Sequence, residues 1–314
     1  MSGKKSDIEQ KITGESAALL LKKLRVSAML HSLLVFLGAF ITQFAASMLC
    51  MIAAGCYVLF VQGQDRAALQ KLLLQSAGDL SMVISLIYAV AAIVWCGILY
   101  RRWEWRERPF NYKKAFERGR IFFIIILGFG ACIVLTVAVG IVAQIFPAAF
   151  ENYQKLMDSL SVERSMLAVP YVALLGPVAE ELIFRGVISD RLKPAFPFWL
   201  VNVIQAALFG IFHMNVIQGA YAFVLGLLLG LVVKVTGTLF SSMILHIVFN
   251  TTSLLLSAFV THVGKLYDIL SGVILFVALL CFLAGYLYFT HEYKRNEKSA
   301  IGRDSGEEKG NMIK

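Results

Sequence analysis

The sequence predicts an all-α fold: a polytopic integral membrane helical bundle of about eight transmembrane helices, with both termini cytoplasmic. Three observations support this. Hydrophobic residues make up 59% of the 314 residues and charged residues only 16%, whereas soluble domains carry about 25% charged residues. Apolar runs of roughly 20 residues, the length that crosses a bilayer as a helix, recur along the chain. Basic residues gather on alternate connections between these runs.

The predicted spans follow one another along the chain, at about residues 27–62, 79–100, 120–146, 164–192, 196–214, 217–233, 238–258 and 269–290. Before them, residues 8–24 could form either an amphipathic surface helix or a solvated tail, and after them we expect the charged tail to be disordered. We divide the chain accordingly into a basic N-terminal segment, three spans with a basic loop, a central unit, a last span and a charged tail: 1–26, 27–163, 164–258, 259–290 and 291–314.

The basic residues orient the bundle. Of the 29 Lys and Arg residues, 23 fall on the side of the N-terminus, 5 fall on the other side, and Arg185 lies within a span. This bias places both termini in the cytoplasm. The net charge of +9 does not indicate a nucleic-acid partner, because the basic residues flank the spans and suit an anionic membrane surface. The loop 101–120, rich in Arg and Trp, has the composition of an interfacial collar.

Three ionisable residues, Glu180, Glu181 and Arg185, lie inside the fourth predicted span. Each charge costs about 2.5–3.5 kcal/mol on insertion scales, so such residues usually face a partner or a cavity. Glu181 and Arg185 are four residues apart and can pair on one helical face. Glu180 points about 100° away, so its partner must come from another helix, a metal ion or water. The preceding Gly176-Pro177 predicts a kink that opens backbone groups towards a cavity.

Two later spans carry further polar residues. His213 follows Phe209 by four residues on one helical face, and His246 and Asn250 are likewise four residues apart. Counted from the inner ends at about 1.5 Å per residue, Glu180 and Asn250 lie roughly 18 Å deep, His213 roughly 25 Å and His246 roughly 12 Å. All four fall within a core of about 30 Å and could meet in one pocket.

Taken singly, each group also has a structural interpretation: an ion pair within one helix, a histidine at a helix end, or polar contacts between helices. Together, at middle depths on three helices, they favour a shared site. A carboxylate, two imidazoles and a carboxamide can activate a water molecule or bind a metal ion. We therefore consider zinc, held by Glu180, His213 and His246, as one option.

These residues resemble the CPBP family of intramembrane proteases, which includes CAAX prenyl endopeptidases and bacterial bacteriocin-processing and immunity proteins. The family signature is E-E-x-x-x-R, then F-x-x-x-H, then H-x-x-x-N, on separate helices. The chain carries all three in this order, as Glu180-Glu181…Arg185, Phe209…His213 and His246…Asn250. The resemblance covers about residues 164–258, so it implies that this central unit is the catalytic core.

The resemblance also implies roles for these residues. Glu180 would be the general base that activates water, with His213 assisting, and His246 and Asn250 would stabilise the oxyanion. Glu181, Arg185 and Phe209 would support the site. The family is described both as metal-dependent and as glutamate-dependent, and the motifs do not decide between these mechanisms.

The expected function is therefore hydrolysis of a peptide bond in a membrane-associated protein or peptide, with a prenylated CAAX-type protein as one option. We expect the lipid bilayer as surroundings and place the protein in a cell membrane, as in a bacterial plasma membrane. One alternative is a non-proteolytic self-immunity or scaffold protein that binds a membrane partner. Another is a proton- or ion-coupled transporter, which the lack of a visible inverted repeat disfavours.

Overall fold

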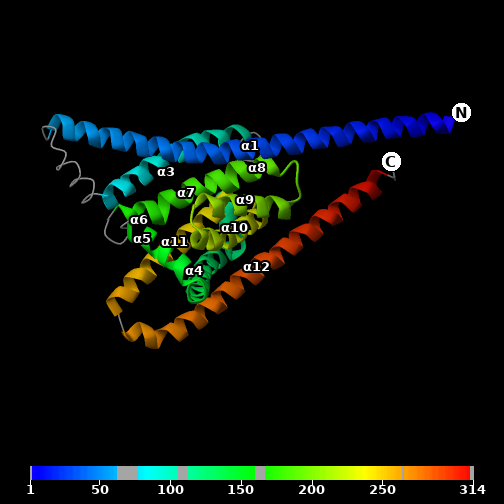
Figure 1. Ribbon diagram of the computed structural model, residues 1–314. Helices are drawn as coiled ribbons and strands as arrows, with labels where there is room; N and C mark the ends of the chain where they lie inside the picture. The colour runs from blue at the N-terminus through cyan, green and yellow to red at the C-terminus, as the bar shows by residue number, and fades with distance from the viewer. Residues whose placement is uncertain (1, 62–76, 105–111, 160–166, 264, 312–314) are drawn as a thin grey trace.

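The fold is a bundle of helices enclosed between two long ones. The computed structural model describes residues 2–61, 77–104, 112–159, 167–263 and 265–311, and all regular secondary structure within these ranges is helical. The long helices are α1 (Ser2–Val61) and α12 (Lys265–Asn311), and α1 begins on the same side of the molecule on which α12 ends (Figure 1). The prediction of an all-α fold is confirmed. Residues 105–111 of the predicted collar 101–120 lie outside the described ranges.

Six of the described helices are long and apolar enough to cross a membrane. This confirms an integral membrane protein, while the count of eight spans and the cytoplasmic placement of the termini stay predictions. Besides α1 and α12, the six helices are α3 (Ala77–Glu104), α4 (Arg120–Ile145), α10 (Val216–Thr236) and α11 (Leu239–Val263).

The fourth predicted span is a continuous helical segment that contains two π-helical stretches. The backbone stays in the right-handed helical region at each junction, and Gly176 N–H donates to the carbonyl of Tyr171, five residues earlier. Pro177 follows and has no N–H to donate. The two π-helical stretches therefore lie on either side of Pro177, where the sequence predicted a kink. The parts are α6 (Ala168–Pro170), η3 (Tyr171–Leu175), α7 (Gly176–Glu181), η4 (Leu182–Ile188) and α8 (Ser189–Leu192).

The fifth predicted span is shorter than expected. Helix α9 (Phe198–Phe212) has 15 residues and is about 22 Å long at 1.5 Å per residue, less than the ~30 Å core. The chain then turns at Met214, which has a positive φ of 53°. Asn215 caps α10 by accepting a hydrogen bond from the N–H of Gln218 at 3.0 Å. Helices α9 and α10 therefore form a hairpin that holds His213 near its tip.

Carboxamide side chains join the two helices of this hairpin. Asn202 Nδ2 donates to the carbonyl of Leu227 at 3.1 Å, and Gln205 Nε2 donates to the carbonyl of Gly226 at 3.0 Å. A Cβ added at Gly230 would overlap Asn202 Oδ1. Gly230 thus makes room for buried amide groups, and Gly226 makes room for close packing against Ala206.

We expect Gly230→Ala to destabilise the protein by about 1–3 kcal/mol, because the added methyl group forces Asn202 out of its hydrogen bond. Thermal unfolding of the purified protein in detergent measures this. Gly140→Ala in α4 is the matched control, since a Cβ there meets nothing within 4 Å. Equal melting temperatures for the two variants would contradict the proposed role of Gly230.

The C-terminal tail differs from its expected disorder, because α12 continues to Asn311. Its first turns after the apolar run are anchored: buried Glu292 lies 3.7 Å from Arg120 and 2.6 Å from Arg295. Asn296 Nδ2 also donates to the carbonyl of Val235 at 3.2 Å. These contacts hold the helix beyond the apolar run, so that the helical register extends into the charged sequence.

Candidate active site

The bundle encloses a large cavity of about 960 Å³. Its walls come from α1, α3, α4, η3, α7, α9, α10 and α11, and from α5 (Pro147–Ser159), a short helix in a segment predicted to be a loop. Most of the lining is apolar. Four polar residues of the three sequence motifs line it: Glu180, His213, His246 and Asn250.

Glu180 presents its carboxylate to this cavity from α7. Its side chain is 15% exposed, and Oε2 lies 3.6 Å from Nε2 of His246 on α11. The carboxylate accepts no hydrogen bond from a described residue, so its remaining lone pairs are available to water or to a bound molecule. The partner expected from another helix is thus His246.

Behind Glu180, a fully buried ion pair holds His246 in place. Glu181 Oε1 accepts hydrogen bonds from Arg185 Nη1 at 2.8 Å and from His246 Nδ1 at 3.0 Å. Because the carboxylate accepts, the proton lies on Nδ1 of His246, and Nε2 faces Glu180. This is the usual way in which a carboxylate fixes the tautomer and orientation of a functional histidine.

The charges of this cluster do not cancel without one further proton. Glu180 and Glu181 contribute two negative charges and Arg185 one positive charge, and all three lie within the membrane bundle. A net charge in such surroundings is costly. One proton held between Glu180 and His246, whose Oε2 and Nε2 atoms lie 3.6 Å apart, brings the sum to zero.

Phe209 packs at the centre of the polar residues. The Arg185 guanidinium lies 4.4 Å from its ring centroid, which is a cation–π contact. The rings of His213 and His246 lie 4.9 and 5.7 Å from it, both edge-on. The carbonyl of Phe209 accepts a hydrogen bond from His213 Nδ1 at 2.9 Å, which leaves Nε2 of His213 as its free nitrogen.

Asn250 connects α11 to the kinked span. Its Nδ2 donates to the carbonyl of Val172 at 2.8 Å. In the π-helical register this carbonyl would accept from the residue five positions later, but that residue is Pro177, which has no N–H. The proline thus frees a backbone acceptor, and Asn250 satisfies it while lining the cavity.

The structure therefore links Glu180, Glu181, Arg185, Phe209 and His246 by direct contacts. His213 is tied to them through Phe209, and Asn250 lines the same cavity, but no hydrogen bond or ion pair between described residues joins either of these to Glu180 or His246. No group of three or more His, Cys, Asp or Glu side chains in the described ranges is placed to hold a metal ion. The zinc set Glu180, His213 and His246 is thus not assembled as a triad, and zinc binding stays a prediction.

Comparison with protein-family models identifies this part of the chain. Residues 162–252 match the model described as type II CAAX prenyl endopeptidase Rce1-like. This segment belongs to the CPBP family of intramembrane proteases. At family level, this match supports a CAAX-type intramembrane endopeptidase, which is a hydrolase, and suggests a membrane-associated substrate in a lipid environment. No curated protein and no solved structure matched the chain.

The Rce1-like domain contains all seven motif residues, yet it covers less than a third of the chain. Helices outside it complete the cavity. Ser85 comes from α3, and Phe150 and Tyr153 come from α5. The three-residue spacing of Phe150 and Tyr153 is a helical signal that could have predicted α5.

Tyrosines are among the polar residues of the site that the sequence motifs did not reveal. Tyr171 and Tyr221 line the cavity, and they and Tyr88 on α3 interact electrostatically with Glu180. No local pattern marks them, since tyrosines in apolar helices are common. Their meeting at Glu180 is visible only in the folded Rce1-like domain and the α3 helix packed against it.

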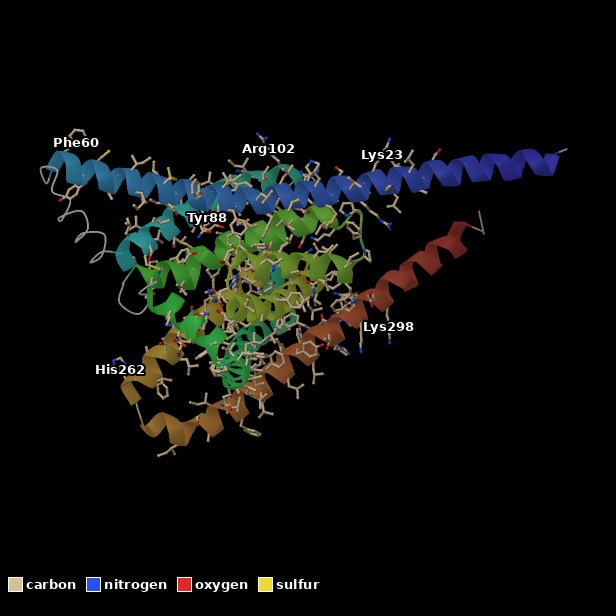
Figure 2. All side chains as sticks on the ribbon, viewed as in Figure 1. Lys23, Phe60, Tyr88, Arg102, His262 and Lys298 are labelled. Carbon is tan, nitrogen blue, oxygen red and sulfur yellow. The ribbon has the colours of Figure 1, made fainter. Side chains whose placement is uncertain are left out.

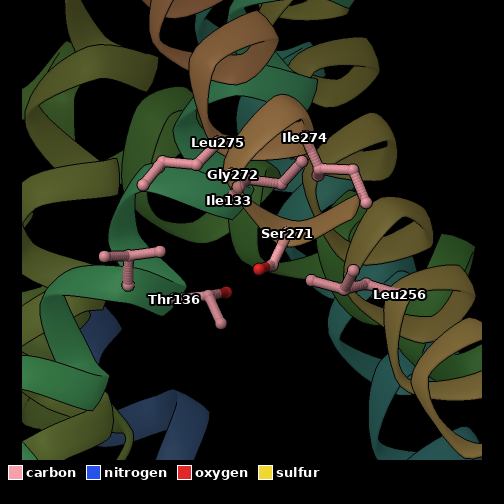
Figure 3. A pocket seen from close by; sticks show the side chains of 8 residues that line it. Ile133, Thr136, Leu256, Ser271, Gly272, Ile274 and Leu275 are labelled. Carbon is pink, nitrogen blue, oxygen red and sulfur yellow. The ribbon is translucent and has the colours of Figure 1, made fainter. Parts of the chain in front are cut away.

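A smaller cavity of about 180 Å³ lies between α4, α11 and α12 (Figure 3). Thr136 lines both cavities, but no ionisable residue lines the smaller one, so we assign no chemistry to it. Its lining residues are Ile133, Thr136, Val137, Leu256, Ser271, Gly272, Ile274 and Leu275.

Proposed function

We propose that the protein hydrolyses a peptide bond of a membrane-associated protein or peptide with a water molecule activated by Glu180. The observation that carries this proposal is the position of Glu180. Its carboxylate faces a large cavity, receives no hydrogen bond from a described residue and lies 3.6 Å from a histidine whose other nitrogen is held by a buried ion pair. A carboxylate of this kind suits a general base.

In the first step, Glu180 takes a proton from water while the water oxygen attacks the carbonyl carbon of the scissile peptide. The carbonyl oxygen becomes an oxyanion. We assign its stabilisation to His246, protonated on Nε2, and to the amide of Asn250, whose Nδ2 has a second hydrogen besides the one given to Val172.

In the second step, the tetrahedral intermediate collapses and the carbon–nitrogen bond breaks. The proton held by Glu180 passes to the leaving nitrogen, so that the products are a carboxylic acid and an amine. His213 assists in this proton transfer through its free Nε2, since Nδ1 is held by the carbonyl of Phe209. Phe209 and the Glu181–Arg185 pair keep the two imidazoles in position.

The cavity suits a peptide segment that carries an apolar group. About 960 Å³ is at the upper end of the range for binding pockets, and most of its wall is hydrocarbon. A prenylated CAAX-type protein fits these properties and the family of the domain. A bacterial origin of the chain and this substrate remain proposals.

The experiment that tests this function is cleavage of matched peptides, with and without a prenyl group, by the purified protein. We expect cleavage, with a higher kcat/KM for the prenylated peptide. A strong chelator should leave the rate unchanged, because no step above needs a metal ion. Loss of activity with the chelator and its recovery with zinc would instead support the zinc hypothesis. No cleavage across a broad panel would favour the binding or immunity function.

A further inference from the structure

The carboxylate of Glu180 and the hydroxyl of Tyr88 are complementary groups that both lack a hydrogen-bond partner. Tyr88 is 2% exposed, and its hydroxyl makes no hydrogen bond to a described residue. Glu180 likewise accepts none. A buried donor without an acceptor is destabilising, so such a group in a native structure calls for a partner.

The position of Tyr88 indicates what that partner is. Tyr88 lies on α3, just below α1 in the view of Figure 2, and α3 packs against η3, α7 and η4. After burial itself, the strongest electrostatic influence on its hydroxyl is the charge of Glu180. Its ring packs against Phe212, which also lines the cavity. The hydroxyl is therefore held on the side of the bundle that contains Glu180.

Two other tyrosines near Glu180 are already engaged. The hydroxyl of Tyr171 interacts with Ser85, and that of Tyr221 with Tyr153. Tyr88 is thus the one of the three whose O–H has no partner in the described part of the chain.

We propose that Tyr88 is a positioning residue that donates its hydrogen bond to the Glu180 carboxylate through one water molecule. One donor fixes the rotation of a carboxylate and leaves its second oxygen free to accept the proton of the attacking water. The hydrolytic site then extends beyond the matched domain to α3. This inference rests on the proposed function of Glu180.

The test is kinetic analysis of Tyr88→Phe beside the wild type and Glu180→Gln. We expect kcat to fall about ten- to hundredfold, the loss typical of a misplaced catalytic group, while KM stays unchanged because Tyr88 does not line the cavity. The melting temperature should change little, because the substitution removes one hydroxyl and keeps the ring that packs against Phe212. Tyr286→Phe, at a 40% exposed position on α12, should have no effect.

The outcomes separate the two hypotheses. Activity in Glu180→Gln would overturn the proposed function itself. An inactive Glu180→Gln together with a fully active Tyr88→Phe would overturn only the role of Tyr88. If Tyr88→Phe unfolds, the comparison moves to p-aminophenylalanine and p-methylphenylalanine at position 88, which have similar sizes but of which only the first donates. Higher kcat with the amino side chain supports the proposal, and equal rates contradict it.

Discussion

Replacing Glu180 with Gln is expected to lower peptide hydrolysis by at least about a thousandfold, within the range for loss of a general acid–base group. Glutamine has nearly the same shape, so a bound substrate still fits, but its amide cannot take the proton of the attacking water. The assay is cleavage of a peptide by the purified variant, with substrate binding measured in parallel. We expect binding to change little.

The fold should tolerate this substitution, because Glu180 forms no hydrogen bond with a described residue and its side chain is 15% exposed to the cavity. A melting temperature equal to that of the wild type would confirm that the lost rate is chemical. Glu151→Gln on α5 provides the matched control, since its carboxylate is 64% exposed. Full activity of Glu180→Gln would show that another group activates the water.

Removing Arg185 is expected to have the largest effect on stability. Arg185→Met leaves the Glu181 carboxylate, which is 0% exposed, without its cation. Breaking a buried pair in this way costs about 3–5 kcal/mol, and here the cation–π contact with Phe209 is lost as well. Thermal unfolding in detergent should show a large fall in melting temperature.

The double variant Glu181→Leu with Arg185→Met separates stability from function. Without either charge, the pair is replaced by apolar groups of similar size, which is often neutral or stabilising. The melting temperature should therefore recover. Activity should not, because His246 Nδ1 loses the acceptor that fixes its tautomer. A double variant with wild-type activity would show that the buried pair has no role in positioning His246.

The exposed pair of α5 gives the control for the buried one. Lys155 and Glu151 have the same four-residue spacing and lie 2.6 Å apart, but their side chains are 68% and 64% exposed. Exposed pairs contribute little to stability, so Lys155→Met should leave the melting temperature nearly unchanged. A similar loss for Lys155→Met and Arg185→Met would mean that burial is not the cause.

Local sequence rules predicted much of the bundle and of its polar centre. Apolar runs marked the membrane helices, and the spacing of Glu181 and Arg185 marked a pair on one helical face. These rules failed where tertiary contacts override composition. The tail from Lys294 reads as disordered, yet contacts at Glu292 and Asn296 continue the helix. The segment 196–214 has the composition of a full span, yet α9 ends at Phe212 in a hairpin.

The sequence by itself determined an integral membrane, all-helical protein and the identity of the ionisable residues inside it, because hydropathy and helical period depend on neighbours along the chain. Only the tertiary structure decided how these residues are partnered. It joins Glu181 to His246, 65 positions apart, and Asn250 to the carbonyl that Pro177 leaves free. It also packs α3, which carries Tyr88, against α7, which carries Glu180. Such contacts depend on how helices pack in three dimensions, and no spacing within one helix encodes them.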